Sequence, residues 1–361
     1  MKIYSVLALS LLLLSGTTIC AAPRVAADTA DIKFDRNAGG STAWEHIYAV
    51  NVIYPQLPFS IKAGGILNDL QKEYAGKKVQ FFAIVPLPEN LLKSFAANHP
   101  EFDFTLCADP ELKTLRQMLG SGNTINPANI FNYSGKLLWS GDSIDLPMML
   151  KIITGGRYSE RNEIRMSALS SSLQAALRSG NARLISESAD KILNLRPEQL
   201  SAVNAKAYAL ETSGDLAALE KFFRSRIQRF PQAEENYFML MDIAYRQAPL
   251  AALAPEIALA YIKKFPRQGE NINSIAWSLL NNQPYSAEAF TAAQAAIAQL
   301  NKLPEFAQKS RVLTTRALLA YRQCNLKLAQ KLAAQALQKA TSPADKAMLE
   351  NLLKYFEKIA Q

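Results

Sequence analysis

The chain has 361 residues, of which 49% are hydrophobic and 20% are charged, and this length and composition suit two globular domains with ordinary cores. Its three cysteines and two histidines exclude a disulfide-rich scaffold, and no two of them stand at the spacing of a zinc site. We therefore expect neither a metal site nor a cofactor.

The formal net charge of +9 is unevenly placed along the chain. Residues 1–155 hold equal numbers of acidic and basic residues, so the whole excess lies in residues 156–361. There the charges are spread along helical faces, which favours a solvated surface over a surface for an acidic partner or an envelope. No aromatic and basic motif of an RNA-binding module occurs, and nucleic acid is not an expected partner.

The amino terminus has the three parts of a secretory signal: Lys2, an apolar run over residues 6–14, and a stretch of small residues. We predict a signal peptide over residues 1–21 and a protein that is exported, either to the periplasm or out of the cell. The apolar run is shorter than the ~20 residues of a membrane span, so we expect no transmembrane segment in the mature chain. Lipid anchoring through Cys20 is the alternative, which the bulky Ile19 before it disfavours.

After a polar lead over residues 22–42, which we expect to be flexible, the hydrophobic pattern alternates between the periods of strands and helices. Strands are predicted over 46–53, 78–85, 102–107, 129–133 and 136–139, and helices over 61–74, 88–98, 109–119 and 144–153. Asp109 before Pro110 is the signal of a capped helix start, and Ser134 with Gly135 joins the last two strands as a hairpin. This order predicts a mixed sheet covered by helices on both faces.

Three stretches of this region match a known family: VNVIYPQLPFS, TLCADPELKTL and INPANIFNYSGKLLWSGD. With them, residues 30–155 resemble the thioredoxin-like fold, in its thiol-disulfide oxidoreductase and peroxiredoxin-related branch. The resemblance implies an α/β thioredoxin-like domain over residues 43–155. It also implies that Pro127, which follows Asn126, is the family's cis-proline and lies beside the active corner.

The cysteines of that family are missing from the corner, because Leu57 and Ser60 stand where it has Cys-x-x-Cys. Leucine is no nucleophile, and we expect Ser60 to cap the following helix rather than to react. The resemblance thus implies a degenerate active corner without a catalytic residue, made of Leu57, Pro58, Phe59, Ser60, Asn126 and Pro127. Cys107 is the alternative catalytic residue, although its place at the end of an apolar strand favours a role in packing.

From about Glu160 the sequence becomes helical and repeats itself. Pro197, Pro231 and Pro266 lie 34 and 35 residues apart, and Gly180 and Gly214 lie 34 apart. A glycine between two helices and a proline after the second, at this period, resemble the tetratricopeptide repeat, which we predict over residues 160–361. Cys324 is expected at the turn position of the two glycines, and a last helix over 343–359 is expected to cap the stack.

A generic array of helical hairpins is the alternative, because Leu219 and Arg226 stand where the repeat usually has alanine. Either array implies a curved surface for a protein or peptide partner. We therefore expect an exported, non-catalytic scaffold or partner-binding protein of the cell envelope. The alternatives are an atypical thiol-disulfide oxidoreductase or peroxidase that uses Cys107, and a substrate-binding protein with a pocket at the old corner.

Overall fold

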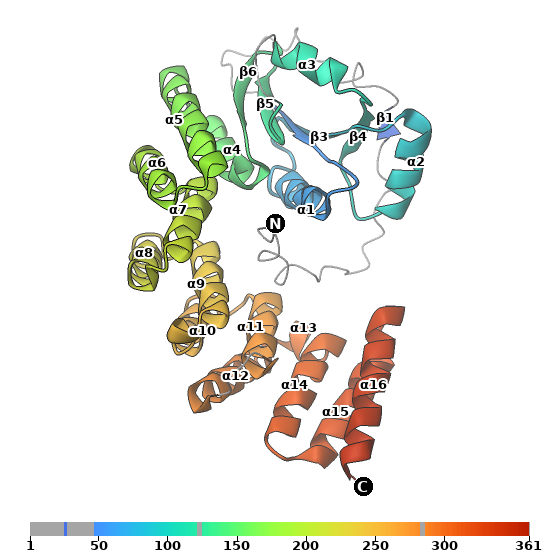
Figure 1. Ribbon diagram of the computed structural model, residues 1–361. Coiled ribbons are helices and arrows are strands. Elements are labelled where there is room, and N and C mark those ends of the chain that lie inside the picture. Colours follow the sequence, from blue (N-terminus) through green and yellow to red (C-terminus); the bar gives the residue numbers. More distant parts are fainter. Residues whose placement is uncertain (1–24, 27–46, 121–124, 282–285, 361) are drawn as a thin grey trace. The chain divides into compact units, whose positions relative to one another are not determined.

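The computed structural model of the protein describes residues 25–26, 47–120, 125–281 and 286–360 (Figure 1). The described residues as far as Gly214 form one compact unit, and those from Asp215 onward form a second. The predicted signal peptide, Cys20 and all of the predicted lead except Val25–Ala26 lie outside the described residues. Within the described ranges, no helix is both long enough and apolar enough to cross a membrane.

The first unit is built around a mixed β-sheet. Its strands are β1 (Val25–Ala26), β2 (Ile47–Val52), β3 (Val79–Val85), β4 (Thr105–Ala108), β5 (Ala128–Asn132) and β6 (Leu137–Gly141). Their order across the sheet is β1-β4-β3-β2-β5-β6. The strands β1 to β4 are parallel, and β5 pairs antiparallel with both β2 and β6. The strands from β2 to β6 confirm the predicted mixed sheet and its terminal hairpin.

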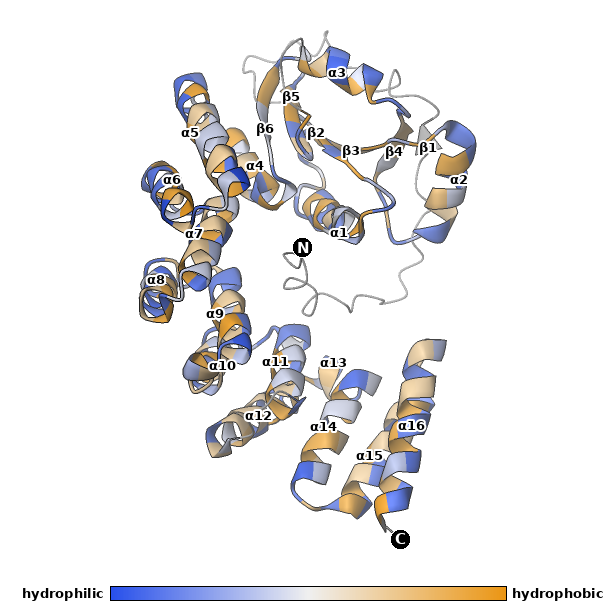
Figure 2. Ribbon diagram, viewed as in Figure 1, coloured by the Kyte–Doolittle hydropathy of each residue, from blue (hydrophilic) through white to orange (hydrophobic). Residues whose placement is uncertain are grey.

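Helices cover both faces of this sheet, as the alternating pattern predicted. The helices α1 (Pro58–Glu73), α2 (Glu89–Asn98) and α4 (Leu146–Thr154) pack on one face, and α3 (Lys113–Leu119) packs on the other. Successive residues of β2 enter opposite cores: Ile47 and Ala49 face the first group of helices, and Tyr48 and Val50 face α3. A strand buried on both sides is expected to be mostly apolar, and Figure 2 shows hydrophobic residues along the central strands.

The start of α3 differs from the prediction. The helix begins at Lys113 rather than at Asp109, because Leu112 has a left-handed backbone (φ 54°) that no helix can include. The amide of Leu112 donates to the carbonyl of Asp109 (3.0 Å) and closes a turn before the helix. Asp109 still provides an acceptor for the first turn of α3, because its Oδ2 accepts a hydrogen bond from the amide of Leu115 (3.0 Å).

Two adjacent glycines of α1 provide a matched test of this packing. A Cβ built on Gly64 would lie 2.4 Å from the buried ring of Phe102, whereas one built on Gly65 would meet nothing within 4 Å. We expect Gly64→Ala to lower the free energy of unfolding by about 1–3 kcal/mol through overpacking. We expect Gly65→Ala to raise it by about 0.5–1 kcal/mol, because alanine favours the helix. Urea denaturation of the two variants checks both signs, and a gain from Gly64→Ala contradicts the close approach.

The rest of the chain is helical and its helices pack in pairs. The first unit holds α5 (Glu160–Ser179), α6 (Ala182–Leu195) and α7 (Leu200–Thr212). The second holds α8 (Leu216–Arg229), α9 (Glu234–Arg246), α10 (Leu253–Lys264), α11 (Gly269–Asn281), α12 (Ala287–Leu300), α13 (Pro304–Ala307), α14 (Ser310–Arg322), α15 (Leu326–Lys339) and α16 (Pro343–Ala360). The closest pairs are α5 with α6, α6 with α7, α9 with α10, α11 with α12, α14 with α15, and α15 with α16. This confirms a long region of paired helices after the sheet.

The repeated sequence motifs mark where helices end and begin. Pro197, Pro231 and Pro266 each lie two residues after the last residue of a helix, where a residue without an N–H cannot interrupt it. Three helix-to-helix turns share one conformation, in which a residue with positive φ precedes a side chain that caps the next helix: Gly180 (67°) before Asn181, Gly214 (72°) before Asp215, and Cys324 (59°) before Asn325. The turn position predicted for Cys324 is thereby confirmed.

Cys324 carries a strain that the two glycines avoid. A left-handed backbone costs a residue with a Cβ roughly 1–2 kcal/mol, and Cys324 is exposed, so its side chain gains little from packing. We expect Cys324→Gly to raise the free energy of unfolding of the second unit by about 0.5–1 kcal/mol. Thermal and urea denaturation measure this change. Gly180→Ala, in the equivalent turn, is the reverse control and is expected to destabilise.

Within the first unit, the helices are tied to the sheet at two places. At the edge strand β6, the hydroxyl of Tyr158 donates to the carbonyl of Leu138 (2.7 Å), and Lys136 pairs with Glu160 (3.0 Å). An edge strand offers unpaired backbone groups, so these contacts cover part of the exposed edge.

The second tie caps α7 from a distant part of the chain. Gln199, the N-cap residue of α7, makes no side-chain capping bond. Instead, the carboxylate of Asp145 accepts hydrogen bonds from the amide (3.1 Å) and the hydroxyl (2.5 Å) of Ser201. Asp145 lies in the short 3₁₀ helix η2 (Ser143–Asp145) before α4, and only 2% of its surface is exposed. Burial raises the pKa of this carboxyl, while the bonds from Ser201 act in the opposite direction.

Candidate functional site

The corner between β2 and α1 has a closed helix start. Leu57 is the N-cap residue of α1, is half-buried, and makes no side-chain capping bond. Pro58 follows as an exposed first helical residue and has no N–H. The amides of Ser60 and Ile61 both donate to the carbonyl of Leu57 (2.9 and 3.3 Å). A reactive thiolate is stabilised by open amides at a helix start, and here these three positions offer none.

Ser60 does not cap α1, so this expectation was wrong. The helix begins two residues earlier, which makes Ser60 its third residue and turns the hydroxyl back toward the strand. Its Oγ accepts a hydrogen bond from the amide of Tyr54 (2.8 Å) and donates to the carbonyl of Val52 (3.4 Å). The hydroxyl is buried and fixes the end of β2 to α1, and neither of its two partners is a base.

The loop that holds Asn126 and Pro127 lies beside the end of β2. The amide of Val52 donates to the carbonyl of Pro127 (2.8 Å), which sets the loop before β5 beside the end of β2. Asn126 donates through Nδ2 to the hydroxyl of Ser140 (2.9 Å), and Pro127 is exposed. The end of β2 therefore lies between the hydroxyl of Ser60 and the loop that holds Asn126 and Pro127. The side chain of Phe59 lies outside the described residues.

Four polar residues around the corner were missed by the sequence analysis. On one side, the hydroxyl of Ser140 donates to Asn129 (2.7 Å), and Asn129 donates to the carbonyl of Asn126 (3.1 Å), which closes a ring of bonds. On the other, Asn51 donates to the hydroxyl of Ser143 (3.2 Å). Asn51 and Asn129 interrupt apolar strands, which was the signal that could have found them. Amides and hydroxyls without a titratable partner position a loop but transfer no proton near neutral pH.

Cys107 lies elsewhere in the sheet. Cys107 belongs to β4 and pairs with Ile84 of β3, and it is fully buried against Leu115 and Leu119 of α3. The strand β3 separates β4 from β2, and Pro127 lies on the far side of β2. The structure therefore does not bring Cys107 to the corner, and burial in an apolar core opposes formation of a thiolate.

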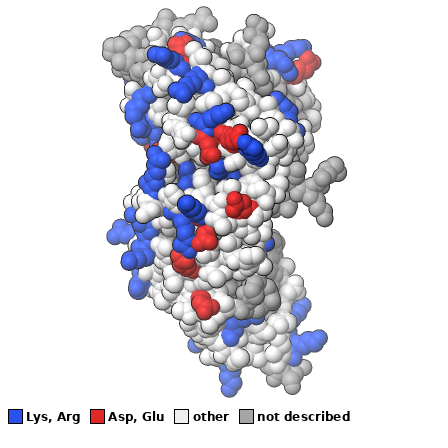
Figure 3. All heavy atoms as spheres, turned by 60° about the vertical axis from the view of Figure 1, so that its left-hand side comes forward, with Lys and Arg blue, Asp and Glu red and all other residues white. Residues whose placement is uncertain are grey.

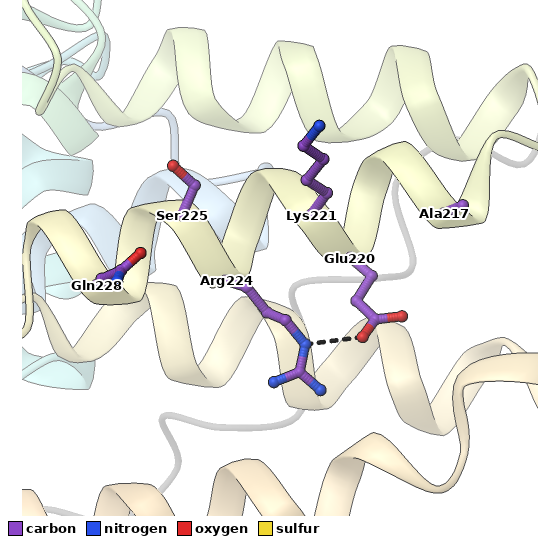
Figure 4. A pocket seen from close by; sticks show the side chains of 6 residues that line it. All are labelled: Ala217, Glu220, Lys221, Arg224, Ser225 and Gln228. Carbon is purple, nitrogen blue, oxygen red and sulfur yellow. Dashed lines mark hydrogen bonds and ion pairs between the residues drawn. The ribbon is translucent and has the colours of Figure 1, made fainter.

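Beyond the corner, an open hollow of about 570 Å³ runs along α8 in the second unit (Figure 4). It is lined by Ala217, Glu220, Lys221, Arg224, Ser225 and Gln228. Arg224 is bonded to two carboxylates there. Its Nε donates to Glu220 (2.7 Å), and its two terminal nitrogens donate to Glu256 (2.6 and 2.7 Å). These bonds raise the pKa of Arg224. The guanidinium of Arg224 in this hollow is therefore already bonded to two carboxylates of the same unit.

On the face that Figure 3 shows, Lys and Arg lie mainly along the left side, with Asp and Glu among them. Among the residues that the structure describes, no group of three His, Cys, Asp or Glu side chains has the arrangement of a metal site.

Comparison with known proteins adds no relative to this description. No protein family matches the chain, and searches of curated proteins and of solved structures also return no match. The fold is therefore defined by its own topology: a mixed-sheet α/β domain followed by an all-helical region of paired helices.

Proposed function

We propose that this protein is an exported, non-catalytic scaffold or partner-binding protein, in which a thioredoxin-like domain without its dithiol carries a tetratricopeptide-like array. The strand order of the five longer strands and the position of Pro127 beside β2 support the thioredoxin-like interpretation. The recurrent turn at Gly180, Gly214 and Cys324 supports a repeat array. Export rests on the signal predicted from the sequence.

One observation carries the non-catalytic part of this proposal: Leu57 occupies the helix start where a nucleophilic thiol would stand, and the hydroxyl of Ser60 is bonded on both sides. Acid, base and nucleophile are thus missing from the corner residues described above. The burial of Cys107 speaks against the alternative of a thiol enzyme.

Partner binding rests on the array, because stacked helix pairs expose long, side-chain-rich surfaces that hold peptides or proteins.

Reduction of insulin disulfides in the presence of dithiothreitol tests the claim that the protein is non-catalytic, and we expect the full chain to give the uncatalysed rate. A rate above that background that disappears in Cys107→Ser would contradict it.

The claim that the helical array binds a partner is tested on a protein captured by the full chain from the native envelope and then purified. Its dissociation constant should be unchanged by Leu57→Ala and raised by charge reversal at Lys221, which lies on the exposed hollow of α8. A partner whose affinity depends on Leu57 and not on the array would move recognition to the corner and refute this assignment.

A further inference from the structure

The outer face of the last helix, α16, carries a row of apolar side chains. Met348, Tyr355 and Ile359 are 44%, 50% and 46% exposed, and Leu352 between them is half-buried. Their spacing of four, three and four residues keeps them on one side of the helix. We call these four residues the α16 stripe. Leu349 and Phe356, on the neighbouring side, are fully buried against α14 and α15 and hold the helix in place.

The stripe is held in position by its neighbours. The hydroxyls of Tyr355 and Tyr321 are hydrogen-bonded (2.9 Å), and their rings meet edge to face at 5.8 Å between centroids. A large side chain that is already fixed loses little entropy when it enters an interface. Exposed aromatic and aliphatic anchors of this kind are typical of the central residues of protein interfaces.

Charge indicates what covers this stripe. The helices α14 and α15 each contain three basic residues and no acidic residue, whereas α16 contains three of each and is neutral. An acidic partner would be drawn to the basic helices rather than to α16. Two copies of this chain, with a net charge of +9 each, repel one another over most of their surface, and a neutral apolar helix is a place where they can meet.

We infer that the α16 stripe is the contact through which two copies of this chain associate, with the two α16 helices antiparallel about a two-fold axis. The spacing of the stripe is the same in both directions, so it is complementary to itself. Met348 then faces the partner's Ile359, and Leu352 faces the partner's Tyr355. Asn351 lies near the partner's Lys358, and no like charges meet along this edge of the helix.

The size of the contact sets its strength. An 18-residue helix is about 27 Å long, so one helix pair covers less than the roughly 800 Å² per partner of a standard interface. We expect a reversible dimer with a dissociation constant of about 10–500 µM. This inference stands apart from the proposed function, since it concerns neither the corner nor the partner surface.

Sedimentation equilibrium of the full chain tests the inference. Tyr355→Asp and Ile359→Lys should each weaken the dimer at least about tenfold, and circular dichroism should confirm that the variants are folded. Leu328→Asp on α15, a side chain that is 39% exposed outside the stripe, should leave the dimer unchanged. A chain that stays monomeric up to about 1 mM, or a dimer that neither stripe variant weakens, overturns the inference.

Disulfide trapping tests the antiparallel register. In a Cys324→Ser background, an equimolar mixture of Met348→Cys and Ile359→Cys chains should form the mixed disulfide well above its share in the 1:2:1 ratio of random pairing. A 1:2:1 ratio of the three products, or an excess of the Met348→Cys homodimer, would exclude the register.

Discussion

The double variant Leu57→Cys/Ser60→Cys is expected to reduce insulin disulfides with dithiothreitol at least tenfold faster than the chain that keeps Leu57 and Ser60. The substitution sets a Cys-x-x-Cys pair at the start of α1, with its first thiol at the N-cap position. There the positive end of the helix dipole lowers a thiol pKa from about 8.5 toward the range ~3.5–7.5 and favours the thiolate that attacks a disulfide. The exposed loop residue Pro127, beside the end of β2, completes the corner that the thioredoxin-like interpretation requires.

All proteins in this experiment carry Cys324→Ser, so that the exposed thiol makes no contribution, while the buried Cys107 stays in each of them. The single variants Leu57→Cys and Ser60→Cys are the controls, and neither should turn over, because a lone thiol stops at the mixed disulfide. A double variant that forms its internal disulfide, shown by mass, and yet remains at the background rate would argue against the thioredoxin-like corner.

Asp145→Ala is expected to lower the free energy of unfolding of the first unit by about 2–3 kcal/mol. The variant leaves the amide and the hydroxyl of Ser201 without their acceptor at the start of α7, in a buried place. A buried donor without a partner costs about 1–3 kcal/mol, and the loss of a helix cap costs about 0.5–2 kcal/mol. The effect is located at α7 if amide hydrogen exchange, compared with the wild type, increases more in peptides from α7 than in peptides from β2.

Two milder variants control this experiment. Ser201→Ala removes only the hydroxyl bond and should cost about 1 kcal/mol. Asp142→Ala removes an exposed carboxylate that accepts from the amide of Ile144 (3.1 Å) and should cost at most about 1 kcal/mol. An Asp145→Ala protein as stable as Asp142→Ala would show that the distant cap contributes little.

The stability of the first unit should also depend on pH through Asp145. Burial raises the pKa of this carboxyl in the folded protein, so the folded state takes up a proton at a higher pH than the unfolded chain, where the pKa is about 3.9. Its contribution to the free energy of unfolding is therefore fully present below about pH 3.9 and is lost as the pH rises through the raised value.

Asp145→Asn removes this titration and is the reference. The wild type should gain stability over Asp145→Asn as the pH is lowered from 7 toward 4, measured by urea denaturation. A change in the opposite direction would mean that the bonds from Ser201 outweigh burial and hold the pKa of Asp145 below its ordinary value.

Local patterns in the sequence predicted most of the elements and their order, although β1 falls in the stretch expected to be a flexible lead. Alternating periods located the strands around Ile47 and Val79, and the 34-residue spacing of glycines and prolines located the helix pairs, because both signals are local and repeat within one element. The absence of cysteine at Leu57 and Ser60 was equally plain from the sequence. Side-chain chemistry at a known turn needs no tertiary information.

The contacts between distant segments could not be predicted from the sequence and are seen only in the folded chain. Ser60 turns back to Tyr54 and Val52 because Pro58 sets the helix start, and Asp145 caps α7 across 56 residues because η2 and α7 pack together. Gly64 is required by the ring of Phe102, a residue that no local pattern associates with it. Such contacts depend on which surfaces the fold brings together, and a short stretch of sequence does not show which distant residues will meet.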